Sequence, residues 1–501
     1  MIFRRIYDEA LAQASYLIGN PCGGDALVVD PRRDIDVYLE AARQESLRIT
    51  AVAETHLHAD FVSGARELAG KTGATLYLAG EGGDAWPYRG LDGLEHVLLK
   101  GGDAFAVGDL RVEARHTPGH TSEGLSCLVW DTGAGAQPAL ILTGDFVFVG
   151  DLGRPDLLEE VVGIQGAAEA GARQLYRSLR TQFLTLPDFV QVWPGHGAGS
   201  ACGRALGPDI STTVGFERRS AWWADYLAEG DEEGFVRALL AGQPEVPTYF
   251  KRVKRLNQDG PPPVGTLQMP FKLSPYELRD AQGGEALLVD TRDSRAFAAG
   301  HFRGSINLPA GTTFATWAGW LLPDDRPLVL LTSAAEVEAL ARQLLRLGLD
   351  RIEGYYPGLD DHLPLPSALD VLPQVTADEA KTLWEEGEAT FLDVRTAEEY
   401  GAGHLPGAVN VHAGRVTQAL EQLPKDRPVV AYCRTGRRSS IAASALRAAG
   451  YENVIDLTGG IQAWQAERYP VTREGGGAAS PDGGSRHDWE EAERDAVALP
   501  K

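Results

Sequence analysis

The chain is poor in cysteine and lacks long apolar runs. Only four of its 501 residues are cysteines and no two form a CxxC pair, so a structural zinc knuckle is not expected. No apolar run approaches the ~20 residues of a membrane-spanning helix, and the N-terminal residues show no cleavable signal pattern. We therefore expect a cytoplasmic protein without a membrane partner, in which a thiol with a function is catalytic.

Basic residues are scarce relative to acidic ones. The 47 Lys and Arg residues against 70 Asp and Glu residues give a formal net charge of -23. A protein that binds nucleic acid needs a basic face for the phosphates, so nucleic acid is not expected as a partner. The chain is also too long for one hydrophobic core, and its length predicts two to four domains.

The second half of the chain contains an internal repeat. LVDTRDSRAFAAGHFRGSIN (288–307) and FLDVRTAEEYGAGHLPGAVN (391–410) share Asp, Arg, Gly, His and Asn at equivalent positions. RPLVLLTSAA (326–335) and RPVVAYCRTG (427–436) extend the match, and each leads into a helical run. Because short β runs alternate with helical runs in both copies, the repeat predicts two tandem α/β domains with parallel sheets.

Proline-rich segments mark the expected domain boundaries. PPPVG (261–265) and LPLPSALDVLP (363–373) are stiff, helix-breaking stretches that suit linkers. The end of the chain is polar, glycine-rich and acidic, a composition that favours disorder. We expect three domains and a disordered tail, over residues 1–260, 268–366, 374–474 and 475–501 respectively.

Histidine, aspartate and glycine gather at four places in the N-terminal domain. These places are THLHADFVSG (55–64), TPGHT (117–121), TGD (143–145) and PGHG (194–197). Ligands at strand ends, spread over a long stretch, suit a metal enzyme built on sheets. Four such clusters in this order resemble the metallo-β-lactamase fold superfamily. That resemblance implies an αββα sandwich with its metal site at one edge of the sheets.

The first cluster departs from the pattern of that superfamily. Its hydrolases usually carry two metal ions, both served by an HxHxDH motif, and Phe61 stands here in place of the last histidine. The resemblance then implies one remaining metal site, with three ligands and an optional fourth, His58. Residues that can instead orient ligands or substrate are His58, Asp60 and His196. The three implied ligands are His56, His120 and Asp145.

Two imidazoles and one carboxylate with open positions suit Fe(II) in oxygen chemistry. A binuclear hydrolase shares a bridging hydroxide between two metals, whereas a mononuclear oxygenase needs vacant positions for O2 and substrate. Phe61 therefore favours one Fe(II) per chain. The alternative is that Phe61 only packs against the loop while two metal ions, such as zinc, bind to poorer ligands.

A longer stretch narrows the resemblance within the superfamily. DFVFVGDLGRPD (145–156) is similar to the corresponding stretch of persulfide dioxygenases. The resemblance implies that Arg154 helps to hold a thiol substrate. A structural salt bridge is the alternative role for this residue.

A different cysteine site lies in the second copy of the repeat. YCRTGRRS (432–439) follows an apolar strand and opens a helical run, where backbone N–H groups and arginines favour an anionic sulfur. With LDVR and GHLPGAVN, the pattern Cys-x-x-Gly-x-Arg resembles a rhodanese sulfurtransferase. A phosphatase loop would need one more residue before the arginine. The resemblance implies a catalytic Cys433 with Arg438, and a persulfide cradle formed by Arg434, Gly436 and Arg437.

The first copy of the repeat lacks these features. Thr332 stands at the cysteine position, the loop has no glycine or arginine, and Glu336 would repel an anion. Residues 268–366 are therefore expected to form a rhodanese fold without activity, which serves as a scaffold.

Three cysteines remain outside the sulfur-transfer loop. Cys202 lies six residues after His196, which places it near the metal pocket, and the resemblance to persulfide dioxygenases and sulfurtransferases implies that it is a candidate for sulfur transfer. Cys22, in GNPCGGD, is a second candidate by the same resemblance, and the alternative for both is a buried or idle thiol. Cys127 lies in the apolar run LSCLVW and is expected in the core.

Over nearly its whole length the chain resembles bacterial persulfide dioxygenase–sulfurtransferase fusions. The resemblance implies oxidation of low-molecular-weight persulfides to sulfite by Fe(II) and O2, then transfer of sulfur from Cys433 to sulfite as thiosulfate. Such chemistry detoxifies sulfide, with glutathione, bacillithiol, coenzyme A or cysteine as the carrier thiol. A homodimer or homotetramer is expected. The alternatives are a thioester hydrolase of the glyoxalase II type and a non-oxidative sulfur carrier.

Overall fold

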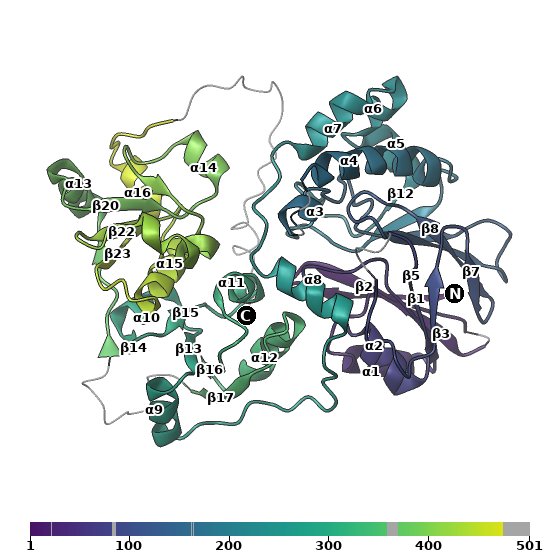
Figure 1. The fold of residues 1–501 in the computed structure, drawn as a ribbon, viewed down its shortest axis with the longest axis horizontal. Helices are drawn as coiled ribbons and strands as arrows, with labels where there is room; N and C mark the ends of the chain where they lie inside the picture. The colour runs from purple at the N-terminus through teal and green to yellow at the C-terminus, as the bar shows by residue number, and fades with distance from the viewer. Residues whose placement is uncertain (22, 83–86, 162, 164, 358–368, 474–501) are drawn as a thin grey trace, which may run out of the picture. The chain divides into compact units, whose positions relative to one another are not determined.

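The computed structural model describes residues 1–473 apart from 22, 83–86, 162, 164 and 358–368. The chain divides into two compact units, one running from Met1 to Thr266 and the other beginning at Leu267 (Figure 1). The division falls directly after the predicted linker at 261–265. The predicted tail lies outside the described residues. Within the described part of the chain, no helix is long and apolar enough to cross a membrane.

The N-terminal unit is built on two six-stranded sheets. In spatial order, the first sheet contains β1 (Ile2–Asp8), β2 (Gln13–Gly19), β3 (Asp25–Val29), β4 (Arg48–Ala53), β5 (Thr75–Ala79) and β6 (His96–Leu99). The second sheet contains β12 (Thr212–Thr213), β11 (Gln191–Pro194), β10 (Leu140–Gly144), β9 (Leu125–Asp131), β8 (Leu110–His116) and β7 (Ala104–Val107).

The central strands are apolar on both faces, and their side chains alternate between two cores. On β9, Cys127 and Val129 enter the core between the sheets, whereas Leu128 enters the core under the helices of the second sheet. On β3, Leu27 and Val28 divide in the same way between the inner core and the helices of the first sheet. The expected core position of Cys127 is confirmed, and burial raises the pKa of its thiol to about 12.

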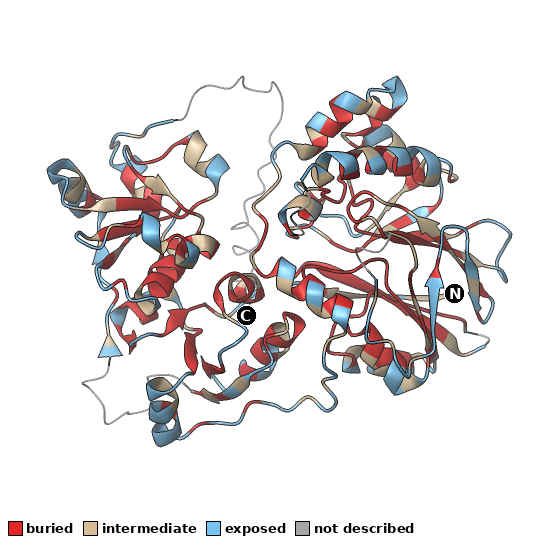
Figure 2. Ribbon diagram, in the orientation of Figure 1, coloured by how far each residue is buried: buried red, intermediate tan, exposed pale blue. Residues whose placement is uncertain are grey.

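Helices cover the outer face of each sheet, which completes an αββα sandwich and confirms the predicted fold class (Figures 1 and 2). The first sheet is covered by α1 (Asp36–Gln44) and α2 (Ala65–Thr72). The second is covered by α4 (Ala167–Ser178), η1 (Leu179–Phe183), α5 (Val214–Ser220), α6 (Ala224–Glu229) and α7 (Glu232–Leu240). The unit also contains the short α3 (Leu157–Glu160) and ends with α8 (Phe250–Asp259).

The second unit contains two small parallel sheets, as the repeat predicts. The first copy has β15 (Ile306–Asn307), β13 (Leu287–Asp290), β16 (Leu328–Leu331) and β17 (Ile352–Tyr356), with α9 (Pro275–Gly283), α10 (Ser294–Ala299), α11 (Phe314–Leu321) and α12 (Val337–Arg346). The second copy has β19 (Gln374–Val375), β23 (Val454–Leu457), β22 (Val429–Tyr432), β20 (Thr390–Asp393) and β21 (Val409–Asn410). Its helices are α13 (Ala377–Glu386), α14 (Ala397–Ala402), η2 (Ala413–Gln418), η3 (Leu420–Gln422), α15 (Arg437–Ala448) and α16 (Gly460–Ala466).

Part of the predicted second linker is structured. Leu369–Asp370 forms β18, which pairs antiparallel with β14 (His301–Phe302) of the first copy. The two copies also touch through Trp320, whose ring packs against His412 with centroids 4.8 Å apart. The segment is therefore more than a spacer, because its backbone adds a strand to the first copy.

The residues shared by both copies hold the fold. Arg395 donates to Asp393 through Nε (2.9 Å) and Nη2 (2.6 Å), and Nη2 also donates to the Gly403 carbonyl (2.7 Å). In the first copy, Arg292 makes the same contacts with Asp290 and its own glycine. The Asp and Arg residues that the two copies share therefore have a structural role in each copy, and their repetition does not indicate duplicated chemistry.

Arg395→Ala is expected to destabilise the second copy by about 3 kcal/mol, because it leaves the fully buried Asp393 carboxylate without its cationic partner. Urea unfolding followed by tryptophan fluorescence measures the change, since α16 and α13 carry the packed pair Trp464 and Trp384. Arg427→Ala removes an exposed arginine of the same domain and should change stability by less than about 1 kcal/mol. Equal losses of stability in the two variants would contradict a structural role for the Arg395–Asp393 pair.

Candidate metal centre and sulfur-transfer loop

Three buried side chains meet at the ends of strands in the N-terminal unit. His56 follows β4, Asp145 follows β10, and His120 lies in the loop between β8 and β9, with ligand atoms all within 4.8 Å of one another. Asp145 Oδ2 lies 3.5 Å from His120 Nε2 and 3.9 Å from His56 Nε2. This oxygen is buried and has no hydrogen-bond partner among the described residues. A cation bound between the three groups would satisfy it.

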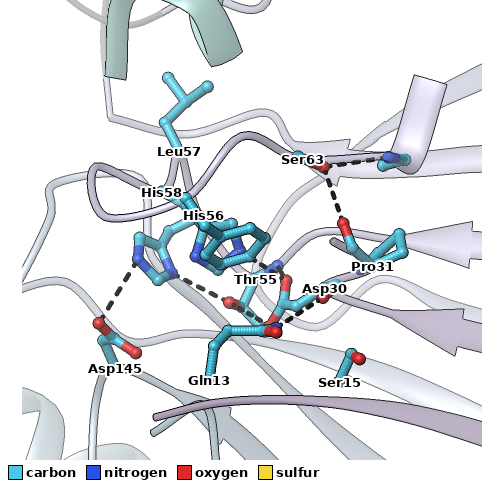
Figure 3. A network of polar contacts seen from close by, with 12 residues as sticks. Gln13, Ser15, Asp30, Pro31, Thr55, His56, Leu57, His58, Ser63 and Asp145 are labelled. Atoms are coloured by element: carbon cyan, nitrogen blue, oxygen red, sulfur yellow. Dashed lines mark hydrogen bonds and ion pairs between the residues drawn. The ribbon is translucent and has the colours of Figure 1, made fainter. Parts of the chain in front are cut away.

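Hydrogen bonds on the far side of each ring leave Nε2 available as a ligand. His120 Nδ1 lies 2.9 Å from the Arg154 carbonyl, which can only accept, so Nδ1 carries the proton. Thr55 Oγ1 donates to Asp30 Oδ2 (2.8 Å) and can therefore accept from His56 Nδ1 at 3.0 Å (Figure 3). Such partners orient metal-binding imidazoles in proteins.

The charge states of the three groups also suit a metal ion. Burial lowers the pKa of His56 well below its usual value. Burial also lowers the pKa of His120, although Asp145 opposes the shift. Burial raises the pKa of Asp145, but His196 and the two other histidines outweigh it and hold the pKa well below its usual range. Two neutral imidazoles and one carboxylate are the protonation states in which these side chains bind metals.

His58 lies beside the three-residue group rather than in it. Its Nε2 is 3.0 Å from Asp30 Oδ1, and its ring packs on Phe61 with centroids 4.3 Å apart. Burial alone would lower the pKa of His58. The Asp30 carboxylate opposes burial and helps to raise the pKa above its usual value. Asn257 of α8 donates to the carbonyls of both His58 and Phe61 at 2.8 Å and so holds the loop. The contact between His58 Nε2 and Asp30 suits a role in orienting ligands or substrate. That role of His58 stays a prediction.

A second buried group contains Asp60, His196 and Cys202. His196 bridges two carboxylates, with Nδ1 2.7 Å from Asp145 Oδ1 and Nε2 2.8 Å from Asp60 Oδ2. Burial lowers the pKa of His196, but the two carboxylates together raise it well above its usual value. Burial, Asp60 and Asp145 all raise the pKa of the Cys202 thiol. The geometry brings Cys202 to the metal region, while Cys22 lies outside the described residues.

Arg154 is fully buried and makes several contacts with the protein. Its guanidinium donates to Asp156 at 2.9 and 2.5 Å, to the Ala201 carbonyl at 3.2 Å and to the Pro244 carbonyl at 2.6 Å. An arginine has five N–H groups, so these contacts leave one on Nη1 for a ligand. The structure thus shows the salt bridge, and a role in holding a thiol substrate stays a prediction.

The sulfur-transfer loop connects β22 to α15. Cys433 is buried, and its Sγ accepts a hydrogen bond from the backbone N–H of Gly436 at 3.1 Å. Gly436 has a φ of 109°, a region that favours glycine. Gly460 packs beneath the loop, where an added Cβ would lie 2.4 Å from the Cys433 carbonyl oxygen. The sequence predicts a cup of backbone N–H groups around the sulfur, and the structure shows that of Gly436 donating to it.

The arginines of the loop differ in their surroundings. Arg438 forms a two-pronged ion pair with Glu399 of α14, both contacts being 2.7 Å. Burial raises the pKa of Glu399, but Arg438 outweighs it and holds the pKa below its usual value. Arg434 and Arg437 flank the cysteine loop and are only partly buried. The ion pair with Glu399 partly neutralises the charge of Arg438 beside the cysteine loop. A catalytic role of Arg438 stays a prediction.

The first copy has no thiol at the equivalent place. Thr332 follows β16 as Cys433 follows β22. Glu336 accepts from Thr332 Oγ1 at 3.4 Å and from Ser333 Oγ at 2.8 Å, so its carboxylate occupies the start of α12. An anionic persulfide would meet a negative charge there.

Several residues that build these sites carry no signal in the sequence. They come from distant segments, and only the fold shows their partners. Lys254 of α8 is buried, and its charge lowers the pKa of both His56 and His120. The others are Asp30, Asn257, Glu399 and Asp456. Thr55 and Ser439 also take part, but they lie inside the motifs at 55–64 and 432–439.

Comparison with known proteins assigns a family to each part of the chain. The metallo-beta-lactamase superfamily matches residues 9–196, and the rhodanese-like domain matches 274–358 and 376–467. A crystal structure of a metallo-beta-lactamase from Staphylococcus aureus is 36% identical, with a TM-score of 0.63, and covers 71% of this chain and 98% of that chain. A sulfurtransferase from Allochromatium vinosum is 35% identical over 92 residues, 18% of this chain and 86% of that protein.

A third similar structure is ETHE1 from Myxococcus xanthus, 27% identical with a TM-score of 0.40, covering 52% of this chain and 96% of that chain. The assignment rests on the two relatives above 30% identity, each covered over most of its own length. Together with the family matches, they show that the chain belongs to the metallo-beta-lactamase superfamily and joins that metal-binding fold to two rhodanese-like domains.

Proposed function

We propose that the chain oxidises low-molecular-weight persulfides to sulfite with O2 at one Fe(II), and converts sulfite to thiosulfate through Cys433. The observation that carries the proposal is the buried group of His56, His120 and Asp145, with an unpartnered carboxylate oxygen facing both rings. Two imidazoles and one carboxylate that leave coordination positions open are the donor set of non-heme iron oxygenases.

The residues around the group fit a single iron. His56, His120 and Asp145 would hold the ion, which supplies O2 activation and open positions for a sulfur ligand when bound. Phe61 is fully buried against His58, at the place where the hydrolase motif has its extra histidine. Lys254 is buried near the two ligand histidines; burial lowers the pKa of its amine, although Glu123 opposes the shift, and in its protonated form it would attract an anionic persulfide.

The oxidation is balanced as R–S–SH + O2 + H2O giving R–SH + SO3²⁻ + 2H⁺. The sulfur transfer then uses a second persulfide. The Cys433 thiolate attacks the outer sulfur, the S–S bond breaks, R–S⁻ leaves and Cys433–S–SH forms. Sulfite attacks that outer sulfur, thiosulfate leaves, its proton passes to solvent and the thiolate is restored. The backbone N–H of Gly436, which donates to Cys433 Sγ, would stabilise the anionic sulfur in both states.

Metal content and O2 uptake test the proposal. We expect the purified protein to contain about one iron per chain, as one His2Asp group predicts, and to consume O2 only when glutathione persulfide is added. Persulfides of cysteine and coenzyme A in the same electrode would identify the carrier thiol. Iron at this level without persulfide-dependent O2 loss would contradict the dioxygenase.

A two-zinc thioester hydrolase is the second candidate. The group Asp60, His196 and Cys202 favours it, because a carboxylate, an imidazole and a thiolate can bind zinc. A probable zinc-dependent hydrolase of polyketide biosynthesis from Bacillus velezensis is also 25% identical over 42% of this chain and 85% of that protein. Two zinc ions per chain, with thioester hydrolysis and no O2 uptake, would select this function.

A further inference from the structure

A buried chain of hydrogen bonds runs from the sulfur of Cys433 into the core of its domain. Ser439, in the first turn of α15, has its Oγ 3.6 Å from Cys433 Sγ and 2.6 Å from Asp456 Oδ1. The other oxygen of Asp456 accepts from Gln374 Nε2 of β19 at 3.0 Å. Ser439 is fully buried, and Asp456 is 2% exposed in β23, an interior strand of the sheet.

Ser439 has one hydroxyl hydrogen and two candidate acceptors. When Asp456 is ionised, the hydroxyl donates to the carboxylate and offers the sulfur no hydrogen. When Asp456 is protonated, the carboxyl can donate to Ser439 Oγ, and the serine hydrogen is free to turn toward Cys433 Sγ. The hydrogen bond that stabilises an anionic sulfur therefore depends on where the Asp456 proton lies.

We propose that Asp456 is a positioning residue of sulfur transfer, which stores the Cys433 proton and turns the Ser439 hydroxyl toward the thiolate. The inference rests on the sulfur-transfer half of the proposed function and does not depend on the metal centre. In the step, the Cys433 S–H bond breaks as its hydrogen passes to Ser439. The serine hydrogen passes to Asp456, and the product is a thiolate beside a neutral carboxylic acid.

The surroundings of Asp456 support proton storage. Burial raises the pKa of its carboxyl, while the hydrogen bonds from Ser439 and Gln374 lower it by less. Neither of these partners is charged, and no ionised group contributes to the shift. The other charged groups of the loop are Arg434, Arg437 and Arg438, of which Arg438 is paired with Glu399 of α14. A buried carboxylate without a cation takes up a proton more readily than one at the surface.

Storage of a proton on Asp456 fits the proposed cycle of sulfur transfer at Cys433. Cys433 is needed as a thiolate both for attack on the donor and as the group that leaves when thiosulfate forms. A neutral Asp456 avoids a second negative charge beside that thiolate. The Gly436 N–H and the Ser439 hydroxyl then both point hydrogens at the sulfur.

The pH dependence of alkylation tests the inference without using sulfur transfer. We would treat the full chain with iodoacetamide and follow the Cys433 peptide by mass spectrometry. Two groups that share a proton titrate in two steps, so the wild-type rate should rise in two steps. Asp456→Asn should give one step at intermediate pH, because an amide can donate to Ser439 and accept from Gln374 at every pH.

Two further variants decide whether Asp456 acts on the Cys433 thiolate directly or through Ser439. Ser439→Ala should slow alkylation at neutral pH about tenfold, the effect of losing a hydrogen bond to a charged group. Asp456→Asn added to Ser439→Ala should change the rate little, because Asp456 acts through the serine. Asp378→Asn, which alters an exposed carboxyl of the same domain, should keep both steps.

A single step in the wild-type profile would overturn the inference, whether or not the variants fold. An Asp456→Asn profile identical to wild type in a protein with unchanged thermal unfolding would also overturn it. Failure of the proposed function looks different, because the two-step profile would remain while persulfide and sulfite gave no thiosulfate.

Discussion

Replacing Asp145 by asparagine is expected to remove the bound metal and, with it, all persulfide-dependent O2 consumption. Asp145 supplies the single carboxylate of the group, and its unpartnered Oδ2 faces both His56 and His120. An amide keeps the shape of the side chain but loses its charge. Even partners that only orient metal ligands change affinity ~10–100-fold, so loss of a ligand charge should weaken metal binding by more than about 100-fold.

Metal analysis and O2 uptake on the same preparation measure this effect. Asp131→Asn is the matched control, because it removes one carboxylate that forms an ion pair with the N-terminal amine at the surface of the same unit. The control should keep its iron and its O2 uptake. Asp145→Asn should still form thiosulfate from added persulfide and sulfite, because Cys433 is untouched. An Asp145→Asn protein that keeps one metal per chain would show that other residues bind the ion.

The strands and layers of the fold could be predicted because their signals are local. Apolar runs such as LSCLVW mark strands that are buried on both faces, and Cys127 lies in the inner core as expected. The repeat in the second half likewise predicts two copies of one domain. Its shared Asp and Arg residues form the same buried ion pair in both copies.

The partners of the site residues could not be predicted, because they come from distant segments. Asp30 reaches the metal region through Thr55 and His58, which lie 25 and 28 residues further along the chain. Gln374 meets Asp456 across 82 residues. No periodicity or local motif encodes contacts at such separations.

Arg154 shows what the fold adds to the sequence context of one residue. Its sequence context allows either a substrate contact or a salt bridge. The fold brings Asp156, the Ala201 carbonyl and the Pro244 carbonyl around one guanidinium. These contacts fix the planar guanidinium in place, and the backbone carbonyl of Arg154 accepts from His120 Nδ1, while a contact with a thiol substrate stays a prediction. In the second half of the chain, by contrast, the candidate site residues all lie within one short motif, YCRTGRRS (432–439).

Replacing Cys433 by serine is expected to change the product from thiosulfate to sulfite without stopping O2 uptake. The serine has no sulfur to carry, so sulfite made at the metal centre would accumulate. We expect thiosulfate formation to fall more than about 100-fold, because a serine hydroxyl is a weak nucleophile at its free pKa, whereas a cysteine forms some thiolate at neutral pH. Ion chromatography of the products during O2 uptake measures both anions.

Thr332→Cys is the matched control for this experiment, because it places a thiol at the equivalent position of the first copy. In the Cys433→Ser background it should not restore thiosulfate. Glu336 lies at the start of α12 next to that position, so its charge opposes a thiolate there. Thiosulfate release by Cys433→Ser alone would separate the two activities and show that sulfite and sulfane sulfur combine elsewhere. Sulfite release with unchanged O2 uptake would establish that the metal centre makes the acceptor for the sulfur that Cys433 carries.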